Sequence, residues 1–501
     1  MISDPDEVRP LTVGNEGESD FALELETLHE SVAHDFTTTE AGIVPLDRRR
    51  SAVTLGAVWL VLEAGWVYIF TGFALYQAGL NLWETTIDLL IGVVFYFAYS
   101  MVAAFIGSRS GQTHSLLSRS IFGIAGSGLI SLVVFGVQMG WAGYQANLTA
   151  ALFGGLYGWT AILAIGVVLG VVMVFNNLFG FTGLATYARY IVSPLLILWV
   201  IYLVIRGLLE GHVTSANPQA TVPLTQFAAI GTVIGAAVWG AEPDYWRYGK
   251  PKFWFPSLPL AFALIVGLFL SGLAGWTIAN LSPSLDFGPA VGTATHLSLF
   301  GLTWLAFIVI LITQVGINDG NYYESINAIQ NLLGGIKRWK RLYSALICTA
   351  GAALAAWIIP YVISNGFYKL AAFTAIGVPS ATVIMAVDHF VLPRLYRISR
   401  PLDRVPTWSE AGKINWAAVF ALVVSVTFGS FATGLLGNNV NYWGLAPVET
   451  WIAAGAIYVL AVWVSRALRP DFRSILGFNS TISRAEADNG SAVDIGAPRM
   501  V

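Results

Sequence analysis

The sequence predicts an all-α membrane protein that crosses the bilayer twelve times. Of its 501 residues, 56% are hydrophobic and only 11% are charged, whereas a soluble chain carries about 25% charged residues. Apolar runs long enough for a helix to cross a hydrocarbon core of about 30 Å recur along the chain. The Lys and Arg residues fall mainly on one side of such an arrangement. Much of the surface is therefore expected to face lipid.

The two ends of the chain are expected to be cytoplasmic tails. Residues 1–50 are acidic, contain no apolar stretch ahead of a cleavage site and end in Arg48, Arg49 and Arg50. This composition predicts a disordered tail and not a removed signal peptide. Residues 471–501 are predicted to form the C-terminal tail. The single cysteine, Cys348, excludes an internal disulfide, and the net charge of −3 gives no basic field for nucleic acid.

Residues 51–470 are predicted to form one twelve-helix domain. Short turns marked by Gly, Pro and Asn separate the apolar runs and leave no place for a soluble domain. The predicted spans lie near 52–76, 86–107, 127–153, 158–178, 184–206 and 224–241, then near 256–280, 297–333, 342–363, 369–392, 414–436 and 449–468.

The orientation follows from the excess of basic residues that cytoplasmic loops carry. With the N-terminus inside, the outer face holds only Arg206 and Lys369, and an odd number of spans would scramble this pattern. We therefore expect a multi-pass protein of the plasma membrane with both termini in the cytoplasm. The basic residues on the cytoplasmic side are then Arg48–Arg50, Arg109, Arg119, Arg247, Lys250, Lys252, Lys337, Arg338, Lys340, Arg341, Arg394, Arg397, Arg400, Arg404, Lys413, Arg466, Arg469 and Arg473.

Two of the predicted helices are expected to be interrupted. The first contains Gly65 and Gly72, and the sixth contains Gly231, Gly235 and Gly240 ahead of an acid-proline-acid sequence. If residues 51–210 and 222–395 are repeats, the two helices occupy corresponding positions. Paired discontinuous helices indicate a binding site at the membrane midplane, although glycines also serve close helix packing.

Glu63 is the most informative single residue, because it lies about eleven residues into the first span. A charged side chain at the centre of a membrane helix costs roughly 2.5–3.5 kcal/mol on insertion scales. Glu63 should therefore face a cavity, pair with another group or stay protonated. The alternative is a structural acid satisfied by the end of a neighbouring helix.

Polar and aromatic residues in two further spans are candidates for the site. Trp141 and Gln145 are four residues apart and share one helical face, which suits a planar heterocycle; ordinary packing of the tryptophan is the alternative. In residues 318–324, Asn318, Asn321 and Tyr322 share one side, while Asp319 and Tyr323 share another. These groups predict a lined cavity, with a structural network between helices as the alternative.

Several kinds of chemistry are not indicated by the sequence. There is no His-x-x-x-His motif, no cysteine pair and no carboxylate cluster with ligand spacing, so we expect no catalytic metal. There is also no phosphate-binding Gly-x-x-x-x-Gly-Lys loop and no Gly-x-Ser-x-Gly motif. Neither an ATP-driven pump nor a serine hydrolase is expected.

Short motifs follow one another in order over residues 45–400, and their order and spacing are more specific than any one of them. The set resembles the nucleobase-cation-symport-1 family in its purine-cytosine permease branch. The motifs are Gly107-Ser108-Arg109-Ser110-Gly111 with Leu117-Ser118-Arg119-Ser120-Ile121-Phe122-Gly123, Gln138-Met139-Gly140-Trp141-Ala142-Gly143-Tyr144-Gln145, Asp244-Tyr245-Trp246-Arg247-Tyr248, Asn318-Asp319 with Asn331-Leu332-Leu333-Gly334, and Ala386-Val387-Asp388-His389-Phe390.

The resemblance implies a leucine-transporter-type fold, in which a five-helix repeat is inverted in the membrane and two further C-terminal helices follow, over residues 413–470. It also implies alternating access for a purine, pyrimidine or hydantoin-like base, driven by Na⁺ or H⁺. In that family an aromatic residue of the third helix and the amide four residues later contact the base. They correspond to Trp141 and Gln145.

The chain departs from the family pattern at two places. The second stacking aromatic of the family falls on Gly235, with Trp239 four residues on as a substitute only if the helix breaks differently. The hydroxyl pair of the family's sodium site falls on Gly316 and Ile317, which carry no side-chain oxygen. This departure favours proton coupling through Glu63 or Asp319, with Na⁺ as the alternative ion.

The sequence is therefore interpreted as that of a secondary transporter that imports a nucleobase or related nitrogen heterocycle with a cation. Allantoin, hydantoin, vitamin or amino-acid transport on the same fold, a channel, and an intramembrane enzyme are the alternatives. No cofactor, no metal and no obligate protein partner are expected beyond the small-molecule substrate and the lipid bilayer. The predicted substrate-binding residues are Trp141, Gln145, Glu63, Trp66, Gly235, Trp239, Asn318, Asn321 and Tyr322.

Overall fold

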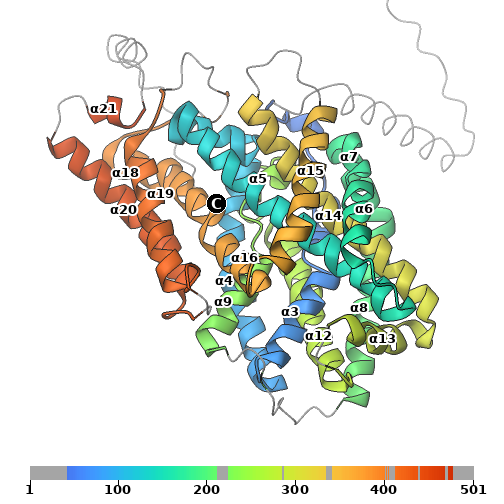
Figure 1. Ribbon diagram of the computed structural model, residues 1–501. Helices are drawn as coiled ribbons and strands as arrows, with labels where there is room; N and C mark the ends of the chain where they lie inside the picture. Colours follow the sequence, from blue (N-terminus) through green and yellow to red (C-terminus); the bar gives the residue numbers. More distant parts are fainter. Residues whose placement is uncertain are drawn as a thin grey trace, which may run out of the picture.

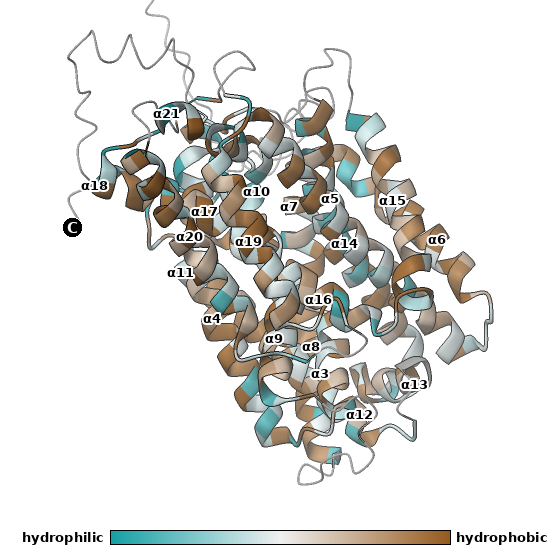
Figure 2. Ribbon diagram, turned by 60° about the vertical axis from the view of Figure 1, so that its left-hand side comes forward, coloured by the Kyte–Doolittle hydropathy of each residue, from teal (hydrophilic) through white to brown (hydrophobic). Residues whose placement is uncertain are grey.

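The computed structural model describes residues 42–211, 220, 224–284, 287–333, 341–400, 402, 404–405, 412–437, 441–468 and 472–477. Every regular element in these residues is a helix. Hydrophobic residues cover the outward faces of most helices (Figure 2), and large apolar side chains such as Leu198, Leu258 and Trp304 are 60–80% exposed. A lipid-facing surface explains this exposure, because water would penalise so much apolar area.

The elements follow one another closely along the chain. The first group is η1 (Leu46–Arg48), α2 (Ala52–Leu62), α3 (Trp66–Gln77), α4 (Leu82–Ser110), α5 (His114–Tyr157), α6 (Ile162–Met173), η2 (Phe175–Phe179), α7 (Gly180–Tyr187), η3 (Ala188–Val192) and α8 (Ser193–Glu210). The second is α9 (Gln226–Ala237), α10 (Pro243–Trp246), α11 (Ser257–Ala263), η4 (Leu264–Phe269), α12 (Leu270–Leu281), α13 (Phe287–Leu297), η5 (Leu299–Gly301), α14 (Thr303–Leu333) and α15 (Arg341–Tyr361). The third is α16 (Gly366–Ile376), α17 (Val378–Ala386), η6 (Val387–Val391), α18 (Leu392–Tyr396), α19 (Trp416–Ala432), α20 (Ala446–Leu468) and α21 (Phe472–Ile475).

The lengths of the helices are consistent with the twelve predicted spans. The exact number of spans stays a prediction. Among the described residues, eight helices are long and apolar enough to cross a membrane, and α2 with α3 makes a ninth as a bent pair. One of the eight, the continuous segment Ile162–Glu210, has 49 residues, about twice what one crossing needs, and the 3₁₀ turn η2 interrupts it. The shorter α9 and α19 are the remaining apolar helices.

Both expected interruptions are present. Helices α2 and α3 meet at an angle of 47°, and Gly65 between them has φ +104°, a conformation that favours glycine. Helix α9 ends at Ala237, and the chain then runs without helix to α10, with Gly240 at φ +84°. Each break leaves backbone N–H and C=O groups without the intrahelical partners they would otherwise have.

Helix α14 lies at the centre of the bundle, with the long α5 packed along it (Figure 1). Helices α19 and α20 lie on one side of the molecule, and α6, α7 and α8 lie on the opposite side (Figure 1). Helices α3 and α12 approach each other most closely at glycines. A Cβ atom on Gly72 would collide with the carbonyl oxygen of Gly272, and one on Gly275 with that of Ile69.

The part of the predicted N-terminal tail that the structure describes is packed onto the helices. We call residues 42–50 the N-terminal strap. The guanidinium group of Arg49 donates to the carbonyl oxygens of Ser108 (2.8 Å) and Gly249 (2.9 Å) and also to that of Arg247. The backbone N–H of Arg50 donates to the carbonyl of Tyr248 at 2.7 Å. The folded domain therefore begins earlier than the predicted boundary at residue 51.

The described start of the predicted C-terminal tail is also packed. The Arg400 guanidinium donates to the carbonyl of Leu476 at 2.7 Å and forms an ion pair with Asp388 at 3.0 Å. The backbone N–H of Gly412 donates to the carbonyl of Gly477 at 3.0 Å. The outer parts of both predicted tails, 1–41 and 478–501, lie outside the described residues.

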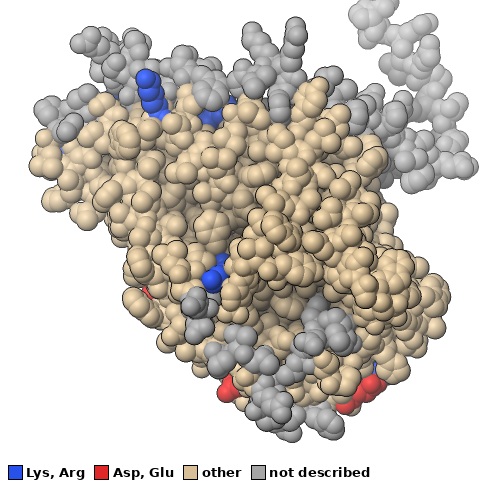
Figure 3. Space-filling model, in the orientation of Figure 1, with Lys and Arg blue, Asp and Glu red and all other residues tan. Residues whose placement is uncertain are grey.

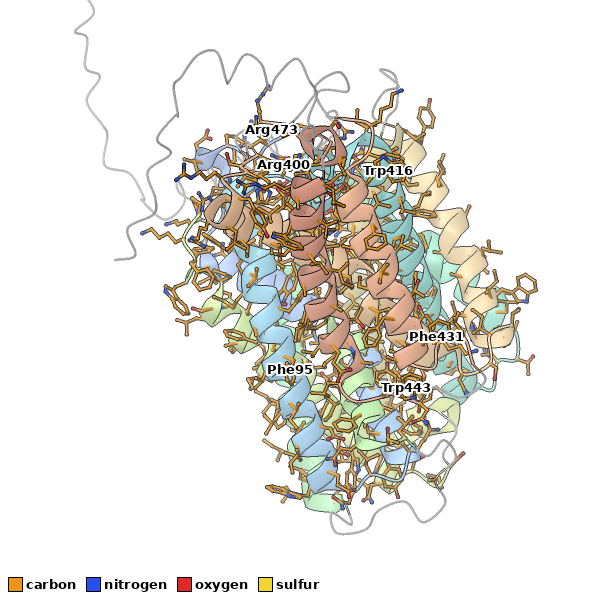
Figure 4. All side chains as sticks on the ribbon, turned by 90° about the vertical axis from the view of Figure 1, so that its left-hand side faces the viewer. Phe95, Arg400, Trp416, Phe431, Trp443 and Arg473 are labelled. Atoms are coloured by element: carbon orange, nitrogen blue, oxygen red, sulfur yellow. The ribbon has the colours of Figure 1, made fainter. Side chains whose placement is uncertain are left out.

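Charged side chains lie mainly at the two ends of the bundle. On the face drawn in Figure 3, most of the visible basic side chains lie at one end and most of the acidic ones at the other, and the surface between them is largely uncharged apart from a basic side chain and a small acidic patch. Arg400 and Arg473 lie at the same end as Trp416, the first residue of α19, while Trp443 lies towards the other end (Figure 4). Tryptophans at both ends of a lipid-facing band are typical of membrane interfaces.

Candidate functional site at the two helix breaks

The carboxyl group of Glu63 lies in the first helix break and is fully buried. The Tyr96 hydroxyl on α4 donates to its Oε1 atom at 2.7 Å. Tyr68 lies nearby, but its single hydroxyl proton is donated to the carbonyl of Leu62 at 2.7 Å. Oε2 of Glu63 has no hydrogen-bond partner among the described residues. A buried carboxyl oxygen without a partner is able to bind a proton or a ligand N–H group.

The second break contains another buried carboxyl group, that of Glu242. Its Oε1 accepts from the backbone N–H of Gly240 at 3.1 Å, and its Oε2 accepts from the Tyr99 hydroxyl at 3.0 Å. The carbonyl of Gly240 accepts from Thr382 of α17 at 2.8 Å. Side chains thus form hydrogen bonds with backbone groups that the interrupted helix leaves unpaired.

One face of α5 runs between the two breaks and carries Gln138, Trp141 and Gln145. Trp141 and Gln145 follow Gln138 by three and seven residues, and residues with this spacing lie on the same side of a helix. The Gln138 amide donates to the carbonyl of Trp239 in the second break at 3.1 Å and to Oε2 of Glu324 at 2.5 Å. The side-chain oxygens of Gln138 and Gln145 both lack a hydrogen-bond partner among the described residues.

The indole ring of Trp141 lies between these two amides. Its Nε1 donates to the hydroxyl of Thr374 on α16 at 2.8 Å. The ring meets Tyr144 and Phe367 edge to face, with centroids 6.2 and 6.1 Å away. These contacts fix the orientation of the indole without stacking either ring on its face.

The same face of α5 continues to the first break through Thr149. The Gln314 amide of α14 donates to the Thr149 hydroxyl at 3.4 Å, and its oxygen accepts from the backbone N–H of Trp66 at 3.1 Å. Trp66 begins α3, and its ring lies against Trp199 of α8 with a centroid distance of 6.5 Å. The N–H group of Trp66 therefore lies within the site, whereas its side chain packs between helices.

The structure separates the two candidates for the second stacking position. Trp239 lies in the second break, beside Gly320 of α14, with Tyr245 edge to face at 6.2 Å. Gly235 lies inside α9, where a Cβ atom would collide with the carbonyl of Ala371 on α16. Gly235 is thus a helix-packing position, and Trp239 is the aromatic residue at the break.

The polar stretch of α14 divides between two faces. The side chain of Asn318 donates to the carbonyl of Ala142 at 3.2 Å, and Asn321 donates to Asn318 at 2.9 Å. The hydroxyl of Tyr322 donates to the carbonyl of Gly170 on α6 at 2.5 Å. Their bonds to α5 and α6 direct all these side chains away from the breaks. Gly320 and Glu324 are the residues of this stretch that face the breaks.

Asp319 does not lie with Glu63. Its carboxylate accepts from the amides of Asn176 at 2.5 Å and Asn177 at 3.2 Å, both in the turn η2. Asp319, the second residue predicted to carry the proton, is therefore held on the side of α14 that faces η2 and not at the break where Glu63 lies. Tyr323, on the same side as Asp319, is bonded by the Arg247 guanidinium at 2.8 Å.

The positions of the family's sodium-site hydroxyl pair lie beside the first break. A Cβ atom on Gly316 would contact Val61 and Val192, and the side chain of Ile317 points at Gly65. Apolar groups therefore surround these two positions, while the Ser271 hydroxyl and the Gln314 side-chain oxygen bond the backbone N–H groups of the break. No group of three or more His, Cys, Asp or Glu residues able to hold a metal is found in the part of the chain that the structure describes.

The sequence reasoning missed Gln138, Glu242 and Glu324 as site residues. Gln138 precedes Trp141 by three residues, so its place on the same helical face was a usable signal. In the sequence, Glu242 belongs to the acid-proline-acid stretch after the glycines of the sixth predicted helix, and Glu324 is one of the polar groups of residues 318–324. Which of several acids faces a break depends on helix rotation, which the sequence does not specify.

Two interrupted helices that cross the middle of an apolar bundle and meet buried polar side chains define a membrane transport protein of the secondary-transporter class. Residues 44–448 match the family described as permeases for cytosine/purines, uracil, thiamine and allantoin. The chain belongs to this permease family, and it is a transporter and not an enzyme.

The chain is similar to characterised relatives over most of its length. It is 25% identical to the cytosine permeases of Escherichia coli O157:H7 and of Escherichia coli strain K12, over 419 residues that cover 81% of this chain and 94% of each relative.

Solved structures confirm the fold. Mhp1, a nucleobase-cation-symport-1 family transporter solved in a closed conformation with bromovinylhydantoin bound, is 18% identical with a TM-score of 0.68, over 90% of this chain and 99% of Mhp1. A Na⁺-coupled sialic acid symporter is 10% identical with a TM-score of 0.62, over 91% and 98% of the two chains.

Proposed function

We propose that this protein imports a nucleobase, cytosine or a purine, or a related nitrogen heterocycle, by symport with a proton. The observation that carries the substrate proposal is the face of α5 on which two unpaired amide oxygens flank an indole ring. A flat heterocycle offers a π-face to the indole and ring N–H groups to the amide oxygens. The names of the curated relatives and the family description support this class of substrate.

Trp141, Gln138 and Gln145 form the proposed recognition face, and Trp239 is the proposed second aromatic contact. Glu63 completes the site at the first break, where its unpaired Oε2 accepts either a proton or a ring N–H group. The backbone N–H of Trp66, now bonded to Gln314, adds a donor on that side. Asn318, Asn321 and Tyr322 act behind α5 as packing partners of this face in the proposal, since their hydrogen bonds lie on that side.

The proposal of a proton as the coupling ion rests on Glu63. A proton carrier needs a group that gains and loses its proton once per cycle while it is shielded from water. Glu63 is such a group, because it is fully buried at a helix break with one oxygen unpaired. A sodium ion prefers several oxygen ligands, and Gly316 with Ile317 supplies none from its side chains.

The proposed membrane is the plasma membrane, with the basic end of the bundle in the cytoplasm. The site is then reached from each side in turn, as the two halves of each broken helix tilt against the remaining bundle. External protons bind before import and leave on the cytoplasmic side. Uptake should therefore rise as external pH falls, because a lower external pH increases both the occupancy of the carrier group and the inward driving force.

The test uses the purified full-length protein in liposomes. Labelled cytosine, adenine, hypoxanthine, uracil, allantoin and thiamine are offered under an inward proton gradient, with Na⁺ or choline as the salt. We expect saturable, competed uptake of cytosine or a purine that persists in choline and collapses with an uncoupler. Uptake that follows Na⁺ at constant pH and ignores the uncoupler would reject proton coupling, and accumulation of only thiamine or allantoin would reject the proposed base.

Substitution of Glu63 separates binding from coupling. Glu63→Gln keeps the size of the side chain but cannot ionise, so proton-driven accumulation should be lost while exchange of labelled for unlabelled substrate persists in part. Asp319→Asn is the matched control, because Asp319 is a buried acid in the same bundle that bonds to Asn176 and Asn177. It should retain accumulation. The reverse pattern in the two variants would move the proton site to Asp319.

A further inference from the structure

Glu324 adds a further buried carboxyl group to the second helix break. It lies one helical turn after Gly320, on the same face of α14, and a Cβ atom on Gly320 would meet the ring of Trp239 at 2.7 Å. The Gln138 amide donates to Oε2 of Glu324 at 2.5 Å, while Oε1 has no hydrogen-bond partner among the described residues. Glu324 thus holds an unpaired oxygen beside the recognition face and the second aromatic contact.

The Gln138 amide is fixed in one orientation. Its two N–H hydrogens are donated to the carbonyl of Trp239 at 3.1 Å and to Glu324. A half-turn of the amide would set its oxygen against both of these acceptors. Oε1 of Gln138, which has no partner among the described residues, is therefore able only to accept. Gln145 differs, because its side chain forms no hydrogen bond with a described residue and is free to present either its oxygen or its N–H group.

Glu324 is expected to be a neutral acid at this place. It is fully buried, and no basic side chain among the described residues is bonded to it. A buried carboxyl group without a cationic partner costs less as the neutral acid than as the carboxylate. Since Oε2 accepts from Gln138, the proton lies on Oε1, which becomes a hydrogen-bond donor. Gln138 and Glu324 thus offer a fixed acceptor and a donor side by side.

We propose that Glu324, together with Gln138, is a specificity-determining residue that selects bases carrying an exocyclic amino group next to a ring nitrogen. This inference rests on the nucleobase transport proposed above and narrows its substrate class. Cytosine and adenine both carry such an edge. The amino N–H group donates to Oε1 of Gln138, and the ring nitrogen accepts from the O–H group of Glu324.

The oxo analogues of these bases present the reverse pattern. Uracil and hypoxanthine carry a carbonyl group where cytosine and adenine carry the amino group, and an N–H group in place of the accepting ring nitrogen. Their carbonyl oxygen would meet the oxygen of Gln138, and their N–H group would meet the O–H group of Glu324. Gln138 is unable to adapt, because the carbonyl of Trp239 holds its N–H groups on the other side. Such a pairing of like with like is how a site rejects a close analogue.

The test measures the affinity for two matched pairs of bases, cytosine with uracil and adenine with hypoxanthine. Purified full-length protein in detergent is titrated with each base by calorimetry. We expect the wild type to bind the amino member of each pair more tightly by roughly 5–150-fold, the factor that corresponds to the penalty for one buried acceptor left unpaired. A wild type that binds uracil and hypoxanthine as tightly as their partners would overturn the inference, while the proposed transport of nucleobases would stand.

Two substitutions of Glu324 separate its O–H group from its size. Glu324→Gln should keep the preference for amino bases, because the new amide accepts from Gln138 through its oxygen and donates an N–H group where the acid donates O–H. Glu324→Leu has neither group and should lose most of the preference, through weaker binding of cytosine and adenine. The opposite result, with Glu324→Leu as selective as the wild type, would remove Glu324 from the site.

Asp319→Asn is the matched control, because Asp319 is a buried acid of the same helix whose carboxylate bonds to Asn176 and Asn177. It should show the wild-type ratio of affinities, and a ratio changed as much as in Glu324→Leu would also overturn the inference. If Glu324→Leu fails to fold, Gln138→Leu decides the matter, since it removes the fixed acceptor and should lose the same preference. Wild-type protein that binds none of the four bases would overturn the inference and the proposed function together.

Discussion

Trp141 shows how one residue serves both the scaffold and the proposed site. Its N–H group is fixed by Thr374, and two aromatic edges hold its ring in place, so a substrate would meet a preorganised surface. The sequence indicated this residue, because the amide four positions on pointed to a shared helical face. It could not indicate Thr374, since the contact between α5 and α16 joins residues 233 positions apart.

The first prediction concerns stacking on this ring. Trp141→Ala should weaken substrate binding by roughly 1–3 kcal/mol, the range measured for base stacking on aromatic side chains. Trp141→Phe should retain part of the binding, because a smaller ring remains but its anchor to Thr374 is lost. Titration of tryptophan fluorescence in detergent measures both, with Thr374→Val to isolate the anchor. Normal binding by a correctly folded Trp141→Ala variant would show that the indole serves packing alone.

The sequence showed which acidic residues lie inside the membrane, but it did not show which groups they bond to. The insertion cost of an acid makes Glu63 conspicuous in any apolar run, and the break around it follows from neighbouring Gly65. The same reasoning applied equally to Asp319, which the structure bonds to Asn176 and Asn177 on the far side of α14. The insertion cost of an acid does not depend on the direction in which its side chain points from the helix. That cost alone therefore does not say which acid faces a break.

At the scale of elements, glycine has two separate uses in this molecule. Gly65 and Gly240 have positive φ at the two breaks, whereas Gly235 and Gly275 allow the backbones of neighbouring helices to touch. The glycine clusters predicted which two helices are interrupted, and both interruptions are present. The sequence could not separate the two uses. A glycine that adopts a positive φ angle and a glycine that lets two helices approach closely both occur as single glycines in an apolar run.

The second prediction tests close approach. Gly275→Ala should destabilise the bundle by roughly 1–3 kcal/mol, as overpacking does, because the new methyl group would overlap the carbonyl of Ile69. Thermal stability in detergent, followed by size-exclusion chromatography, measures the loss. Gly136→Ala is the control, since a Cβ atom there meets nothing within 4 Å and alanine favours the helix. Equal melting temperatures in the two variants would contradict the packing argument.

At the scale of the whole molecule, the distribution of basic residues predicts the orientation in the membrane. Segments that are far apart in the chain are hydrogen-bonded to one another at one end of the bundle. The bonds join Arg49 to Arg247, Gln112 to Leu402 and Arg400 to Leu476. The positive-inside rule gathers such residues on one side of the membrane, whatever the packing within it. Where each helix sits in that bundle depends on tertiary packing, and the twelve sequence ranges alone did not supply it.

The third prediction concerns orientation. Reporters fused after Lys252, Arg341 and Arg404 should all report the cytoplasm, because these residues follow the basic segments of one end. A reporter after Ser284 should report the outside, as should one after Asn439, which lies beyond the described residues. An accessibility assay on intact cells distinguishes the two sides. One reversed reporter among the first three would contradict the twelve-span arrangement.

The N-terminal strap also has a consequence for how the protein is made. Arg49 bonds to the carbonyls of Arg247 and Gly249, which lie 198 and 200 residues later in the chain. At a synthesis rate of about 5–20 residues per second, the ribosome delivers these partners roughly 10–40 s after the strap. During that interval the strap's partners at the end of α4, the carbonyls of Ser108 and Gly111, are already made, but those of Arg247 and Gly249 are not. The strap therefore completes its hydrogen bonds late in biogenesis, and a chain that stops before residue 247 leaves Arg49 with its bond to Ser108 but without those to Arg247 and Gly249.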